Sequence, residues 1–230
     1  EWLTAHVPGI VHTDLLENNF IEDTFYRMNE KDQQWIEEKD WEYKTMFSVG
    51  SEIITRDKII LDFQGLDTYA DVYLNDTIIL EANNMFRNWQ VDVSQTVIRG
   101  ENELRIYFHS PIKKTESIYD NLGYTIPVSS NDQADKKLSI FSRKAPIPFG
   151  WDWGRRLVTS GIWRPVVLRA WNTAVMEEVR IDQKELTDQS ANLLLNIHYN
   201  VTRPFVGEVE IAIDGKILKT TKVDLNHGHQ

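Results

Sequence analysis

YADVYLNDTIILE, residues 69–81, has the pattern of a β-hairpin. Apolar and polar residues alternate before and after Asn75-Asp76, a turn pair that tolerates positive φ. A period of two residues is typical of strands with one buried face. The stretch therefore predicts two antiparallel strands joined by a tight turn.

Further strand patterns lie on both sides of this hairpin, at the spacing of about 8–12 residues that is typical of a β-sandwich. They cover residues 41–49, 58–63, 89–93, 102–108 and 162–171. Helix is expected to be scarce. It is predicted mostly for one amphipathic segment at 26–38 and for the polar connection 111–144, and so long a connection in a compact domain is more often functional than idle.

A second series of strands predicts a second domain. Asn172-Thr173 marks the boundary, and alternation resumes at residues 175–181, 192–201, 206–213 and 217–225, with the hairpin pair Asp214-Gly215 between the last two. The chain is thus predicted to be all-β, with one sandwich over residues 1–172 and another over 173–230. A complete seven-stranded sandwich takes about 100 residues, so the second domain is expected to be truncated or unusually small.

Composition excludes several classes of function. The chain has no cysteine, which excludes disulfides and Cys-based zinc or redox sites. No apolar run approaches the ~18 residues of a membrane span. A formal net charge of −10 disfavours nucleic acid and anionic membrane surfaces as partners. No phosphate-binding loop or nucleophile-elbow motif occurs. We expect no cofactor, no metal, no nucleic acid and no membrane, and a neutral partner.

The chemistry is concentrated in FGWDWGRR, residues 149–156. A tryptophan face can stack on the C–H patches of a pyranose, and a carboxylate accepts charge-assisted hydrogen bonds from its hydroxyls. Trp151 and Asp152 are therefore the candidate sugar-binding residues. In an extended segment Trp151 and Trp153 would share the face opposite Asp152, unless Gly150 or Gly154 bends the backbone.

Two further expectations concern this segment. A guanidinium of Arg155 or Arg156 beside Asp152 would keep the carboxylate ionised, which favours an acceptor role over that of a general acid. A different reading makes the segment a tryptophan-rich corner of the core, in which case Trp151 and Trp153 would both be wholly buried. The sequence leaves the sugar-binding and packing roles open.

The histidines near the N-terminus are weaker candidates. His6 and His12 lie six positions apart across Pro8-Gly9, which matches no compact metal pattern. They are expected to be hydrogen-bonded structural residues. No acid/base pair can be chosen among 35 carboxylates without a pocket.

Several stretches resemble a known family. Residues 149–154 together with 157–166 (LVTSGIWRPV) resemble the signature of β-mannosidases of glycoside hydrolase family 2. The part from Ser160 to Arg164 recurs in the related β-galactosidases and β-glucuronidases. Further matches lie at residues 7–9, 11–16, 67–75, 84–87, 100–104 and 143–145. Together they are highly specific and run through most of the first domain.

The resemblance implies a jelly-roll (galactose-binding-like) sandwich followed by a partial immunoglobulin-like sandwich. In that family both precede a (β/α)₈ barrel that carries the two catalytic glutamates, so the chain is expected to have no catalytic residue of its own and to pack on its own C-terminal barrel. Trp151 and Asp152 would reach into the subsite for a terminal mannose. The alternatives are a stand-alone carbohydrate-binding module, another family 2 glycosidase such as a β-galactosidase, and an interaction sandwich without a sugar role.

Two departures from the family pattern affect the same loop. The family usually has proline where this chain has Arg155, and Gln-aromatic-polar where it has Pro146-Ile147-Pro148. Because Pro-x-Pro restricts φ and removes two backbone donors, the approach of the loop to the barrel is expected to differ.

The resemblance also bears on location. A periplasmic or secreted location is expected, because bacterial relatives that degrade mannosides are often exported.

Overall fold

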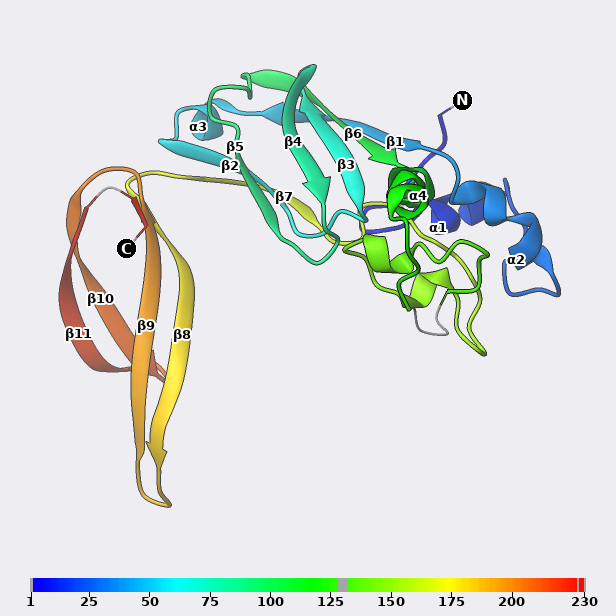
Figure 1. Cartoon of the computed structure of the whole chain (residues 1–230). Coiled ribbons are helices and arrows are strands. Elements are labelled where there is room, and N and C mark those ends of the chain that lie inside the picture. Colours follow the sequence, from blue (N-terminus) through cyan, green and yellow to red (C-terminus); the bar gives the residue numbers. More distant parts are fainter. Residues whose placement is uncertain (1, 128–131, 227, 230) are drawn as a thin grey trace. The chain divides into compact units, whose positions relative to one another are not determined.

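The computed structural model describes residues 2–127, 132–226 and 228–229. The chain forms two compact units, which are drawn in Figure 1. The first comprises residues 1–54 and 60–169, and the second comprises 55–59 and 170–230. Within the described residues, no helix is both long enough and apolar enough to span a membrane.

The first unit is built on two β-sheets (Figure 1). The larger sheet has the order β1 (Trp41–Val49), β6 (Gly100–His109), β3 (Tyr69–Leu74) and β4 (Thr77–Asn83), with antiparallel neighbours. The smaller sheet has the order β5 (Trp89–Asp92), β2 (Lys58–Phe63) and β7 (Val166–Trp171). These strands coincide closely with the strand patterns in the sequence, which confirms the all-β prediction.

The burial of side chains along the strands shows which faces form the core, and it alternates strictly in β3 and in most of β6. Along β3 the side chains of Ala70, Val72 and Leu74 are buried, and along β6 the apolar residues at 104, 106 and 108 are buried. β2 is buried from Ile59 to Phe63. Each fully buried aliphatic or phenylalanine side chain contributes about 1.5–3 kcal/mol to folding, so the sandwich is held mainly by this apolar core.

The β3–β4 hairpin forms as predicted. Asn75 and Asp76 have φ values of 49° and 62°, the left-handed pair of a two-residue hairpin turn. The Asn75 side chain also donates to Thr96 O at 3.1 Å and to Oδ1 of the fully buried Asn102 at 2.8 Å. The turn is therefore fastened to the connection between β5 and β6.

The helices differ from the prediction in three places. The expected helix at residues 26–38 is broken into α2 (Asn29–Asp32) and a 3₁₀ turn, η1 (Gln34–Ile36), and Arg27 just before them has a φ of 51°. α1 (Val11–Glu17) and α3 (Ser51–Ile54) were not predicted. α1 directly follows Pro8-Gly9, a pair that indicates a turn, and its buried face of Val11 and Leu15 packs with Ile36.

The connection 111–144 contains helix, as expected. α4 (Pro111–Asn121) begins with Ser110 as N-cap, whose Oγ accepts from Lys113 N at 3.2 Å, and with Pro111 in the first turn, where no backbone donor is needed. The 3₁₀ turns η2 (Ser139–Phe141) and η3 (Ile147–Phe149) follow. Leu138, Phe149 and Val158 form a small buried cluster beneath this region.

The second unit consists of long antiparallel strands. β9 (Ala191–Val201) lies between β8 (Ala174–Leu186) and β12 (Gly228–His229), and β10 (Phe205–Ile213) pairs with β11 (Lys216–Leu225). The turn between β10 and β11 is the predicted Asp214-Gly215, with φ values of 49° and 78°. The domain limits 1–172 and 173–230 stay a prediction, since units defined by contacts need not coincide with domains.

A buried ion pair lies inside the first unit. Lys144 Nζ donates to both carboxylate oxygens of Asp67 and, at 2.9 Å, to the carbonyl and hydroxyl oxygens of Thr159. Thr159 Oγ1 and Thr68 Oγ1 also donate to Asp67. The side chains of Lys144 and Asp67 are 0% and 1% exposed. This group, called the Asp67–Lys144 cluster below, links three segments of distant sequence.

His12 lies buried within the electrostatic reach of this cluster. Burial, with a further contribution from the Lys144 charge, lowers the pKa of His12 from 6.5 to about 4, and Asp67 opposes the shift. The expected hydrogen bond is not found at Nδ1, which has no partner among the described residues. His6 instead is exposed and pairs with Glu17 at 2.7 Å. His12 is therefore neutral in the folded chain near pH 7.

Because the folded pKa of His12 is below its unfolded value, the unfolded chain binds its proton more tightly. The stabilisation is complete above pH 6.5 and is lost as the pH falls toward 4. From pH 7 to pH 5 we expect this residue to lower the free energy of unfolding by about 2 kcal/mol. Urea titrations at both pH values should show a smaller pH dependence for His12→Gln, and an unchanged dependence would contradict the assignment.

Candidate functional site

The predicted site lies on a tight turn. Trp151 N donates to Gly154 O at 3.1 Å, and Gly154 N donates to Trp151 O at 3.2 Å. Gly150, with a φ of 105°, enters the turn from η3. The extended arrangement considered from the sequence is therefore wrong, and the bend brings the Trp151 and Trp153 ring centroids to 5.2 Å with 35° between their planes.

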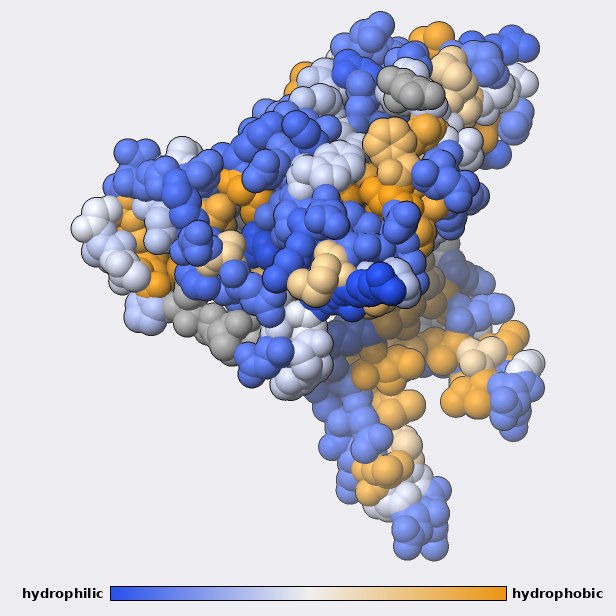
Figure 2. All heavy atoms as spheres, turned by 90° about the vertical axis from the view of Figure 1, so that its right-hand side faces the viewer, coloured by the Kyte–Doolittle hydropathy of each residue, from blue (hydrophilic) through white to orange (hydrophobic). Residues whose placement is uncertain are grey.

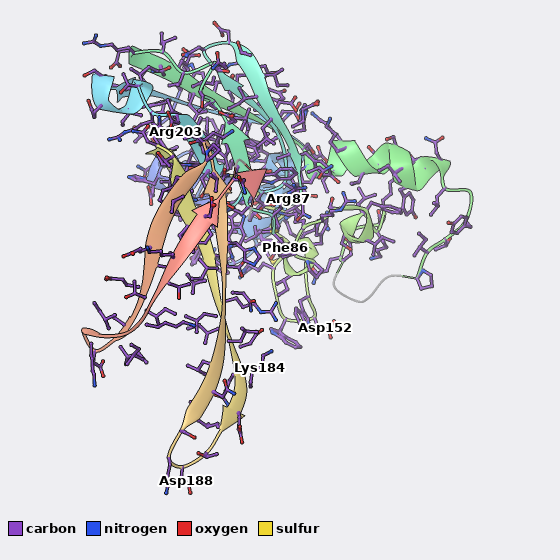
Figure 3. The ribbon with its side chains drawn as sticks, turned by 90° about the vertical axis from the view of Figure 1, so that its left-hand side faces the viewer. Phe86, Arg87, Asp152, Lys184, Asp188 and Arg203 are labelled. Atoms are coloured by element: carbon purple, nitrogen blue, oxygen red, sulfur yellow. The ribbon has the colours of Figure 1, made fainter. Side chains whose placement is uncertain are left out.

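The turn presents its side chains to solvent. Trp153 is 83% exposed, Trp151 is half-buried and Asp152 is exposed. In Figure 3 Asp152 lies at the outer end of its loop. No hydrogen bond or ion pair of the Asp152 carboxylate is found among the described residues. The packing alternative required both tryptophans to be buried, so this exposure favours the sugar-binding role.

The other tryptophans near this motif have separate roles. Trp163 Nε1 donates to Met85 O at 3.1 Å, and the Arg164 guanidinium lies 4.1 Å from the Trp163 ring centroid. Trp171 is half-buried at the end of β7. Trp151 and Trp153 are in ring contact with one another, and Trp163 makes its contacts outside the turn. The candidate site therefore contains two of the tryptophans between residues 151 and 171, Trp151 and Trp153, rather than all of them.

The arginines after the turn do not pair with Asp152, contrary to expectation. Arg155 Nη1 donates to Glu30 at 3.0 Å, and its Nη2 donates to Phe25 O at 2.9 Å. Arg156 is buried and donates to Glu37 at 2.8 Å and to Asp132 at 3.0 Å. Both guanidinium groups thus anchor the loop, and among the described residues no cation is paired with the Asp152 carboxylate.

Arg156 is the centre of a buried charged group at the base of the loop. Its Nη1 also donates to Phe149 O at 3.1 Å, and its main-chain N donates to Glu30 Oε1 at 2.7 Å. Burial raises the pKa of Glu37, and the hydrogen bond and charge of Arg156 oppose that shift. The 3₁₀ and helical turns between residues 29 and 36 are thereby fixed to the segment that follows the tryptophans.

Gln133 contributes hydrogen bonds to the tryptophan turn, and the sequence analysis did not predict this role. It lies in the polar stretch 129–137, of which residues 129–131 lie outside the described part of the chain. Its side-chain Nε2 donates to Trp151 O and, at 3.5 Å, to Gly154 O. The length of the irregular connection was the only signal in the sequence, and it did not identify which residue reaches the turn.

The resulting geometry suits a neutral, hydroxyl-rich ligand. The Trp151–Trp153 ring pair offers a surface for stacking. The Asp152 carboxylate between them in the sequence, for which no partner is found among the described residues, offers a strong acceptor on the same turn. Elsewhere the surface is mainly hydrophilic, with apolar side chains exposed in separate groups on the face in Figure 2. The large cavity of the first unit, about 650 Å³, is lined mainly by apolar residues of the sandwich and the N-terminal segment and does not include the turn.

Residues 1–164 match the family described as glycosyl hydrolase 2 galactose-binding domain-like. The chain belongs to this family. The family 2 resemblance and the galactose-binding-like sandwich inferred from the sequence are thereby confirmed. The galactose-binding-like assignment covers the unit that carries the tryptophan turn.

Similar proteins match over the whole chain or nearly all of it. A β-mannosidase of Rattus norvegicus is 30% identical over 99% of this chain and 27% of its own length. The crystal structure of a β-D-mannosidase from Dictyoglomus thermophilum is 36% identical, with a TM-score of 0.89 over 100% of this chain and 28% of that one. An exo-chitosanase of Amycolatopsis orientalis, 20% identical with a TM-score of 0.73 over 100% of this chain and 24% of that one, shares the fold. The chain spans about a quarter of the length of these relatives.

Proposed function

We propose that this chain is the N-terminal, non-catalytic region of a retaining β-mannosidase that removes terminal, non-reducing β-D-mannose residues. The observation that carries the proposal is the exposed turn at residues 151–154, with its paired rings and free carboxylate, in a chain similar throughout its length to β-mannosidases. The mannoside is the substrate class, and the loop supplies part of its subsite.

The chemistry of such an enzyme needs two carboxylates about 5–5.5 Å apart, one as nucleophile and one as acid/base. In this proposal both lie on a C-terminal barrel against which the sandwich packs. Trp151 stacks on the sugar ring and Asp152 accepts hydrogen bonds from its hydroxyls. Neither transfers a proton. A periplasmic or secreted location remains part of the proposal.

The substrate class is tested with the full-length enzyme. We expect hydrolysis of an aryl β-mannoside with a kcat/KM at least about a hundredfold above that for the matching β-galactoside and β-glucosaminide. Contacts to the ring hydroxyls discriminate between sugars whose substituents differ, because the wrong sugar leaves polar groups of the subsite unpaired. The exo-chitosanase fold relationship makes the glucosaminide an informative comparison. Preference for either other substrate would reject the mannosidase proposal.

The stand-alone binding module is the second candidate, favoured by the exposure of the tryptophan pair. Calorimetry of the 230-residue chain with mannose and β-mannobiose separates the two. An isolated half of a subsite should give no measurable heat of binding at millimolar sugar, since two stacking faces and one carboxylate leave most of the sugar in water. Binding at millimolar or tighter affinity, abolished by Trp153→Ala, would establish the module instead.

A further inference from the structure

Gln133 is the residue that holds the outer part of the loop. Its side chain donates to the carbonyls of Trp151 and Gly154, which are the two ends of the turn, and its main-chain N donates to Phe149 O at 3.0 Å. A Cβ added to Gly150 would lie 2.6 Å from the Gln133 side chain. Gln133 therefore contacts both ends of the turn and the segment that leads into it.

Few other contacts restrain the turn. In the described part of the chain, the backbone hydrogen bonds of residues 151–154 are the two within the turn and those from Gln133. Arg155 and Arg156 anchor the chain only after the turn has ended. Besides the two hydrogen bonds within the turn, the amide of Gln133 therefore holds the backbone that carries the two indole rings and the Asp152 carboxylate.

We propose that Gln133 is a positioning residue for the sugar subsite, acting through the carbonyls of Trp151 and Gly154 without touching the sugar. This inference rests on the function proposed above. The Gln133 side chain is exposed and belongs to neither of the two clusters of buried apolar residues around Ile36 and Phe149. Its substitution is therefore expected to change the geometry of the turn while the sandwich stays folded.

Two substitutions at the same position separate hydrogen bonding from size. Gln133→Met keeps the length of the side chain and removes the donor, whereas Gln133→Lys keeps a donor on a flexible side chain that is one atom longer. Gln95→Met is the matched control, because Gln95 is exposed and no side-chain hydrogen bond of it is found among the described residues. The melting temperature of the 230-residue chain is measured for all three.

The first measurement is circular dichroism, which reports the relative position of the two indole rings on the turn. Indole rings at this separation couple their electronic transitions, so the difference in circular dichroism between the chain and its Trp153→Phe variant isolates the Trp151–Trp153 pair. The Trp35–Trp41 pair, with centroids 6.0 Å apart, is present in both spectra and cancels. We expect Gln133→Met to lose most of this signal, Gln133→Lys to restore it, and Gln95→Met to keep it.

The second readout is the hydrolysis of an aryl β-mannoside by the full-length enzyme. Gln133→Met should lower kcat/KM by roughly tenfold, as misplacement of positioning groups does, mainly through a higher KM. Gln133→Lys should recover most of it, with equal melting temperatures throughout. An unchanged ring signal in Gln133→Met, or a loss that lysine does not restore and that a lower melting temperature accompanies, would overturn the inference.

The same measurements, made also on Trp151→Ala, distinguish failure of the proposed function from failure of the inference about Gln133. If Gln133→Met loses the ring signal and lysine restores it, but Trp151→Ala and Gln133→Met both leave kcat/KM unchanged, the turn is positioned by Gln133 but is not a sugar subsite. That outcome overturns the proposed role of the turn as well as the positioning role of Gln133 in sugar binding. If Trp151→Ala lowers kcat/KM and Gln133→Met does not, only the inference about Gln133 fails.

Discussion

Replacing Lys144 by methionine is expected to destabilise the first unit by about 3–5 kcal/mol, the cost of leaving a buried charge without its partner. The Asp67 side chain is 1% exposed, and in the described part of the chain its remaining side-chain donors would be the hydroxyls of Thr68 and Thr159. Burial lowers the pKa of Lys144 and the Asp67 charge raises it. Each charge of the pair thus stabilises the other in the interior, and removing one of them lowers the free energy of unfolding.

Urea denaturation followed by tryptophan fluorescence measures this effect, because every tryptophan except Trp171 lies in the first unit. Lys44→Met is the matched control. Lys44 pairs with Glu103 at 2.5 Å, but the two side chains are partly exposed, and such surface pairs contribute at most about 1 kcal/mol. An equal loss of unfolding free energy in the two variants would show that the Asp67–Lys144 cluster stabilises the chain no more than a surface ion pair does.

The double variant Asp67→Asn, Lys144→Met tests the cause of the loss. Removing both charges leaves no unpaired ion in the interior, so it is expected to recover part of the stability lost by Lys144→Met alone. Additive losses in the double variant would contradict a charge-pair mechanism and would indicate that packing and the hydrogen bonds to Thr159 account for the effect.

The strands were predictable because their cause is local. The strand patterns along 41–49, 58–63 and 69–74 give the bounds of β1, β2 and β3 residue for residue. A half-buried strand alternates, as 41–49 and 69–74 do, and a more fully buried strand reads as a short, mainly apolar run, as 58–63 does. Positive φ at Asn75 and Asp214 follows equally from residue type. These features depend on the chain within a few residues of each position.

The residues that pair with the arginines of the loop could not be predicted, because they are distant in the sequence. Arg156 and Glu30, which are 126 positions apart, meet only after the sandwich has formed. Sequence adjacency suggested Asp152 as the partner of the arginines, but Glu30, Glu37 and Asp132 are the carboxylates that the fold brings to them. Trp151 and Asp152 could be proposed as a site, but what positions them could not.

In the full-length enzyme, Asp152→Ala is expected to lower kcat/KM for an aryl β-mannoside by about 10- to 150-fold. This is the loss of one charge-assisted hydrogen bond worth roughly 1.5–3 kcal/mol. Binding energy at the subsite also orients the reacting carbon, so part of the loss should appear in kcat. The shape of the pH profile should not change, because in this proposal Asp152 transfers no proton.

Stability provides the discriminating measurement for the same variant. Because Asp152 is exposed, with no side-chain partner found among the described residues, Asp152→Ala should leave the melting temperature unchanged. Asp132→Ala is the contrasting variant, since Asp132 is buried and pairs with Arg156 at 3.0 Å, and it should lower the melting temperature. A normal kcat/KM in Asp152→Ala would remove Asp152 from the subsite, and a lowered melting temperature with normal kinetics would assign it to the fold alone.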